Sequence, residues 1–248
     1  MFAASSPGIG WHSAFEDLQN LQAQLIRKAL GGSVFIAESS VALPASLTTG
    51  ASAQLADLPV GWEDLGYLTK DQGATWSRET QLSEVTSWGA LEPTRSDISS
   101  DTSGLQVTAQ ETKRLTIELF ENVDLSALTP TAVTGEVQFS KPTRPATRYF
   151  RLFAVCVDGV GDDAIYIGKL APRAQITEVG EQAWSDGDDP ISYPLTFGAK
   201  VDSVAGTSMK HYFGGPGWRS ALLSMGFTPL SSEVQTVTEG GSGLTSFT

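Results

Sequence analysis

The sequence predicts a mainly β (α+β) fold, a β-sandwich or barrel with one or two flanking helices. Apolar and polar residues alternate in many short runs, as they do in half-buried strands. Gly, Asp and Gln interrupt these runs where turns are expected. Only short stretches show helical spacing, and this mixture is typical of sandwiches and barrels. We expect an N-terminal arm and helix (1–32), a β domain (33–228) and a C-terminal arm or tail (229–248).

The clearest helix signal covers residues 13–30, after a Gly-rich arm at 1–12. Ser13 is a suitable N-cap, and Glu16 three residues later completes a capping box. Arg27 suits the C-terminal end, before a Gly pair. One apolar stripe runs along the helix: Phe15, Leu18, Leu21, Leu25 and Ala29. The helix either docks on its own domain or packs on a neighbouring subunit, and the pattern fits both.

Short strands fill most of the remaining chain. The run 147–158 is nearly continuous in apolar residues, which indicates a central strand. The predicted strands are 33–37, 62–69, 73–79, 82–88, 104–110, 133–140, 147–158, 164–169, 174–180, 191–197 and 200–204.

Four other segments show different patterns. Residues 38–59 are small, polar and Pro-containing, which predicts a long loop. Residues 92–103 have little to bury and fit an exposed loop or an edge strand. Residues 111–121 alternate like a strand, but i, i+4 pairs favour a helix. A short helical turn is expected at 124–128.

Charge and the two ends of the sequence exclude some classes of protein. A formal charge of −12 argues against a sequence-reading DNA binder, but it permits a protein that lets DNA pass. Acidity also serves solubility. No positive residue precedes Arg27 and no run approaches the roughly 20 apolar residues of a membrane span, so we expect a soluble protein made in the cytoplasm. Cys156 is alone, and we expect a small buried hydrophobe rather than a reactive thiol.

The residues suggest no catalytic, cofactor-binding or metal site. His12 and His211 are the only histidines, and the sequence lacks HExxH, GxSxG and Walker-type motifs. The acidic segments 158–163 and 186–189 fit ordinary turns, with a weak cation site as the alternative. Five of the six Trp residues are spread singly and fit core or interface anchors better than a sugar-binding surface: Trp62, Trp76, Trp88, Trp184 and Trp218.

Several short motifs succeed one another in a characteristic order between residues 30 and 228. They are 61–67 (GWEDLGY), 71–73 (DQG), Trp88, 92–95 (EPTR), 107–112 (VTAQET), 122–126 (NVDLS), 172–174 (PRA), 180–184 (GEQAW) and 214–218 (GGPGW). In this order they resemble the major tail proteins of long-tailed, non-contractile phages that infect actinobacteria.

The resemblance implies a virion structural protein without enzymatic activity or cofactor, with a phage tail-tube-type β-sandwich whose strands join across subunits. Such subunits form rings, typically hexameric, that stack into a tube around a tape-measure protein and later conduct DNA. Tail terminator and tail-tip proteins are further expected partners. We expect ring-to-ring contacts from loops 38–59 and 92–103 and both arms, and a lumen of the same sign as DNA.

Two other classes stay open from the residues alone. One is a carbohydrate-binding β-sandwich module, such as a tail-tip adhesin that uses exposed Trp faces. The other is a hydrolase with two acidic residues in a cleft.

Overall fold

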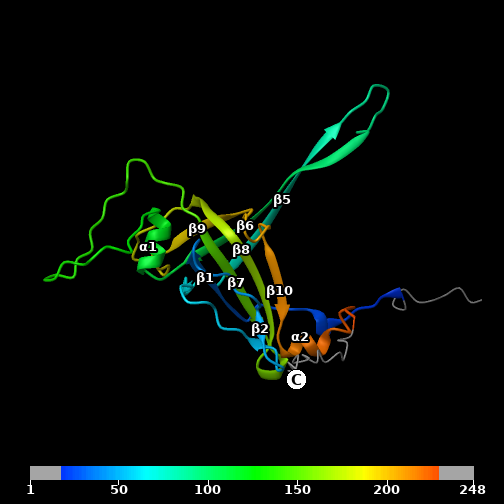
Figure 1. The fold of residues 1–248 in the computed structure, drawn as a ribbon, viewed down its shortest axis with the longest axis horizontal. Helices are drawn as coiled ribbons and strands as arrows, with labels where there is room; N and C mark the ends of the chain where they lie inside the picture. Colours follow the sequence, from blue (N-terminus) through cyan, green and yellow to red (C-terminus); the bar gives the residue numbers. More distant parts are fainter. Residues whose placement is uncertain (1–17, 229–248) are drawn as a thin grey trace, which may run out of the picture.

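A computed structural model describes residues 18–228 (Figure 1). All strand pairs are antiparallel, and helices are few and short, so the predicted mainly β class is confirmed. The helices are α1 (Arg114–Glu121) and α2 (Pro216–Ala221), and 3₁₀ turns lie at Ala23–Leu25 and Gly161–Asp163. The strands are β1 (Gly31–Glu38), β2 (Thr48–Thr49), β3 (Gln54–Leu55), β4 (Glu63–Asp64), β5 (Ala74–Val85), β6 (Arg95–Ala109), β7 (Phe150–Asp158), β8 (Ile165–Val179), β9 (Tyr193–Lys200) and β10 (Lys210–Gly214).

The long strand β8 joins two layers of a sandwich. Its first half pairs with β7 on one edge and with β10 on the other. Its second half pairs with β9, which leads on to β6 and β5. We call β4, β1, β7, the first half of β8 and β10 the β1 layer. The second half of β8 with β9, β6 and β5 is the β6 layer.

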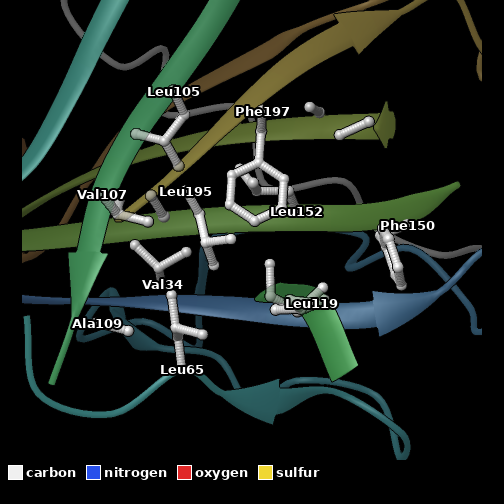
Figure 2. Close-up of a cluster of buried hydrophobic side chains, with 14 of the residues drawn as sticks. Val34, Leu65, Leu105, Val107, Ala109, Leu119, Phe150, Leu152, Leu195 and Phe197 are labelled. Atoms are coloured by element: carbon white, nitrogen blue, oxygen red, sulfur yellow. The ribbon is translucent and has the colours of Figure 1, made fainter. Parts of the chain in front are cut away.

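The core lies between the two layers. Alternate residues of each strand point inward, so Val34 and Ile36 of β1 face Leu105 and Val107 of β6. Figure 2 shows side chains from β1, β6, β7 and β9 converging, and Leu119 of α1 adds to the same cluster. The fully buried side chains include Val34, Ile36, Leu65, Leu105, Val107, Leu119, Leu152, Leu195 and Phe197.

The outer face of the β1 layer is also covered. The loop between β1 and β4, predicted as a long loop, packs Leu47 against Phe153 and Leu170. Trp62 lies edge-on to Phe153 at 6.3 Å between ring centroids, and its indole N–H donates to the Ala42 carbonyl at 3.0 Å. The β1 layer is therefore packed on both faces.

The helix favoured at 111–121 is confirmed as α1. Leu115 and Leu119 are buried on one side, as their i, i+4 spacing predicts. Asn122 ends the helix in a left-handed conformation (φ 52°). The short helical turn predicted at 124–128 is instead a simple turn, in which the Leu128 N–H donates to the Leu125 carbonyl at 3.0 Å.

The predicted helix at 13–30 is wrong over its described part. Residues 18–30 run as an irregular segment with one 3₁₀ turn, and Leu18 and Leu21 are exposed. Because no surface packs on the apolar stripe, nothing stabilises a helix of this length. Residues 13–17, the arm at 1–12 and the tail at 229–248 lie outside the described residues.

Two predicted strands do not form. Residues 133–140 contain a turn in which the Gly135 N–H donates to the Thr131 carbonyl at 2.9 Å, and residues 136–140 pair with no strand of the described chain. Of residues 200–204, only Lys200 is in a strand, because a turn starts at Asp202. Residues 62–69 form only the two-residue strand β4 and an isolated bridge at Leu68.

Other strands are longer than predicted, and one was missed. The strands predicted at 73–79 and 82–88 are a single strand, β5. Those at 164–169 and 174–180 are a single strand, β8, because Pro172 lies where the pairing with β7 shifts register and no ladder bond is needed. Residues 92–103 are mostly strand rather than loop, and β10 was not predicted.

The segment after β4, residues 65–69, connects the β1 layer to the end of β6 in the β6 layer. Leu68 forms an isolated bridge with Ala109 at the end of β6. Gly66 has φ 87°, and a Cβ there would collide with the Glu111 carboxylate. Glu111 accepts the Tyr67 backbone N–H at 2.8 Å and pairs with Lys113 at 3.1 Å. The Tyr67 hydrogen bond, followed by Lys113, holds the pKa of Glu111 below its usual value.

We therefore predict that Glu111→Gln lowers stability at neutral pH and flattens its acid dependence. A carboxyl with a lowered native pKa stabilises the fold above its unfolded pKa of about 4.3, and this is lost as pH falls through the native pKa. Urea midpoints measured from pH 7 to pH 2 test this, with the exposed Glu178→Gln as control. Parallel pH curves for the wild type and Glu111→Gln would contradict it.

Candidate assembly surfaces

The β6 layer has an unpaired strand edge on each side. Within residues 18–228, β5 pairs only with β6, so no described strand pairs with its other edge. At the opposite side, β7 reaches only to Ala174 of β8, which leaves residues 175–179 paired on one edge alone. Unpaired edges present backbone N–H and C=O groups that can bind another strand.

The outer face of the β6 layer is bare and uncharged at its centre. The register places Ser77, Gly104, Gly198 and Gln175 in one row across the layer. The next row contains Thr75, Gln106 and Thr196 and ends at Glu178 on the edge strand β8. On the other side of the first row, Lys200 and Arg173 are paired. This face therefore offers hydroxyl, amide and glycine surface rather than apolar packing.

β5 and β6 continue beyond the sandwich as a long hairpin (Figure 1). All residues from 77 to 99 are exposed. Two ion pairs lie along the hairpin. Arg78 pairs with Asp101, and Arg95 Nε lies 2.6 Å from Asp97 Oδ2. Trp88 and Leu91 at the tip are fully exposed. Large apolar side chains held this far from a core mark an interaction surface.

A second extended segment, residues 126–147, starts beside α1 and projects on the other side of the molecule (Figure 1). Its two ends are held together, since Asn122 donates to the Ala146 carbonyl at 3.2 Å and Arg148 donates to the Val123 carbonyl. Buried Glu118 accepts from the Leu125 N–H at 2.8 Å and from Arg114 at 2.9 Å.

These contacts do not resemble an active site. Among residues 18–228, no three His, Cys, Asp or Glu side chains gather as metal ligands would. Asp158 ends β7, and the other acidic residues at 158–163 and 186–189 lie in connections between strands. His211 is exposed on β10, and His12 lies outside the described residues. Cys156 is half-buried on β7 rather than fully buried, and desolvation raises the pKa of its thiol.

The tryptophans of the described residues fall into two groups. Trp62 and Trp76 pack against the two buried clusters, and Trp218 stacks on Phe213 at 5.1 Å between ring centroids. Trp88 and Trp184 are exposed on different connections, at the hairpin tip and between β8 and β9. The anchor interpretation is confirmed for the packed residues. The long hairpin was missed because both its faces meet solvent, so its strands have no apolar alternation.

A two-layer antiparallel sandwich with long unpaired edges and a projecting hairpin defines a structural subunit built for self-association. A family model for phage tail tube proteins matches residues 19–214. The chain belongs to this family and is a structural component of the virion tail tube. A comparison with curated proteins finds no match. No helix within residues 18–228 is long and apolar enough to cross a membrane.

We predict that Glu118→Ala destabilises the subunit by about 1–3 kcal/mol, because the buried Leu125 N–H loses its acceptor. Urea denaturation gives the change, and Glu121→Ala on the same helix is the control, since no ion pair involving Glu121 is present in the described chain. A urea midpoint of Glu118→Ala equal to that of Glu121→Ala would show that the contacts of Glu118 with Leu125 and Arg114 contribute nothing to stability.

Proposed function

We propose that copies of this chain join edge to edge into a closed, hexameric ring, and that rings stack into the hollow tube of a non-contractile phage tail. The observation that carries this is the β6 layer, which has an unpaired edge at each side and one bare face. The β5 edge of one copy would pair with residues 175–179 of β8 in the next. Two different edges meet at each contact, so the contact is heterologous, and it forms a ring when the rotation between copies closes.

The bare face of the β6 layer then lines the lumen. The β1 layer is packed on both faces, so it lies outside. A wall of Thr, Gln and Gly gives DNA phosphates no cation to bind at its centre, and the acidic chain supplies no general attraction. We infer that DNA passes over a wall whose central strands are uncharged, with one Glu178 per copy at the edge of the Thr196 row. The expectation that the lumen has the same sign as DNA stays a prediction.

The hairpin makes the ring-to-ring contact in this proposal. Beyond Ser77, β5 continues for eight residues, from Arg78 to Val85, roughly 27 Å at 3.4 Å per residue. Because every residue from 77 to 99 is exposed, the tip projects away from the sandwich of its own subunit. Trp88 and Leu91 then find apolar surface on the next ring, as large anchors do at interfaces.

The remaining parts of the proposal rest on the tail-tube role itself. A tape-measure protein occupies the lumen during assembly, and terminator and tip proteins cap the two ends. The chain acts by polymerising rather than by catalysis. The order of its sequence motifs supports a long-tailed phage of actinobacteria, with synthesis in the host cytoplasm before assembly.

Electron microscopy of the concentrated, purified chain tests the assembly. Wild type should form rings and tubes. Trp88→Ser with Leu91→Ser should leave rings but shorten or abolish tubes, with an unchanged urea midpoint because both side chains are solvent-exposed. The matched control is Val60→Ser, another fully exposed apolar residue. If the wild type forms only isolated particles at every concentration, the proposal is refuted. If the tip variant forms tubes as long as those of the wild type, the hairpin does not make the ring-to-ring contact.

The position of the lumen wall has its own test. In a Cys156→Ala background, Thr196→Cys labelled with a heavy-atom maleimide should place added density on the inner surface of the tube, because Thr196 lies on the bare face. Cryo-electron microscopy of labelled and unlabelled tubes gives the difference map. Density on the outer surface would invert the assignment of the layers.

A further inference from the structure

A cleft of about 400 Å³ opens where the hairpin leaves the sandwich, between the hairpin root and β10. This is within the size range of ligand sites, roughly 300–1,000 Å³. Trp76 and Met209, which also pack against the core, line its apolar part. Polar and charged residues line the rest of the cleft, namely Ser77, Arg78, Asp101, Ser103, Lys169, Ser208 and His211.

The cleft carries positive charge in a chain whose net charge is −12. Arg78 and Asp101 neutralise each other, with Nε to Oδ1 at 2.8 Å. Lys169 Nζ lies 5.0 Å from the centroid of the Trp76 ring and makes no ion pair within residues 18–228. The cleft therefore combines an aromatic surface with an uncompensated ammonium group, and it suits an apolar group flanked by acids.

The connection between β8 and β9, residues 180–192, carries such a group. Trp184 is 81% exposed, and its indole N–H donates to Gln182 at 2.9 Å. Gln182 in turn donates to the Ser192 carbonyl at 3.3 Å, which ties the loop to the start of β9. Acidic residues surround the Trp and make no ion pair in the described chain: Glu181, Asp186, Asp188 and Asp189.

The cleft and the Trp184 loop lie at opposite ends of one subunit. Lys169 and Val179 are ten residues apart on β8, about 33 Å along a strand. The loop continues from Val179 on the α1 side, where Phe120 packs on Tyr193 at 5.3 Å between ring centroids. A contact between two different surfaces at opposite ends is heterologous, and it generates a linear assembly when the operation that relates successive copies does not close.

We propose that Trp184 of one copy inserts into the cleft of a second copy, with its flanking carboxylates beside Lys169. The inference rests on the proposed tube, and it adds a second contact along the tube to that of the hairpin tip. The aromatic side chain supplies buried area, and the charges select the acidic loop over other exposed apolar segments.

The concentration at which tubes form, measured for the wild type and for variants of Trp184 and Lys169, tests the contact. Trp184→Ala and Lys169→Glu should each raise the concentration needed for tube formation at least tenfold, because a central Trp or a desolvated charge dominates such contacts. The control Lys70→Glu reverses an exposed charge outside the cleft and should assemble like wild type. Lys169→Glu combined with Asp188→Lys in one chain should recover assembly. Unchanged assembly of both single variants would overturn the contact, as would a double variant no better than Lys169→Glu.

Cross-linking tests the geometry independently of assembly yield. In a Cys156→Ser background, mixed Ser185→Cys and Ser208→Cys chains, both of which keep Trp184, should be joined by a short bis-maleimide, since Ser185 follows Trp184 in the exposed loop and Ser208 lines the cleft. Chains with Ser185→Cys alone should not be joined to one another. Tubes of the mixed chains without this cross-link would refute the contact and leave the tube standing, whereas a wild type that never assembles would overturn both.

Discussion

Backbone hydrogen bonding at the sides of the β6 layer is the constraint on which the structure depends. Strand edges left open in water invite uncontrolled aggregation, and soluble proteins usually shield them. Here the 12 residues of β5 and residues 175–179 of β8 remain open. In the ring that we propose, the same groups find partners in the next copy, and the hazard becomes a defined contact.

The two faces of the sandwich explain why only one layer is available for this role. The β1 layer is covered inside by the core and outside by the loop that carries Leu47 and Trp62. The β6 layer has an apolar inner face but a polar, bare outer face, and it continues into the hairpin. One layer therefore gives each subunit its packing, and the other leaves surface for assembly. The connections that carry the exposed Trp88 and Trp184 also offer surface for assembly.

The sequence predicts the buried parts well and the exposed parts poorly. Short apolar runs identify β1 and β7, whose layer is packed on both faces, and i, i+4 pairs identify α1, which buries one side. The same logic fails at 18–30, where an apolar stripe has no surface to pack on in the single subunit. It fails again at 133–140, whose alternating residues have no partner strand in the described chain. The hairpin and the cleft carry no apolar periodicity, so only the pairing of distant strands reveals them.

Amide hydrogen exchange on free subunits and assembled tubes tests the central claim most directly. The claim is that the open edges of the β6 layer are completed between copies. Amides at the outer edge of β5 and in residues 175–179 should exchange rapidly in free subunits and become strongly protected in tubes, while core strands such as β7 change little. Equal exchange of both edges in the free and assembled states would contradict the account.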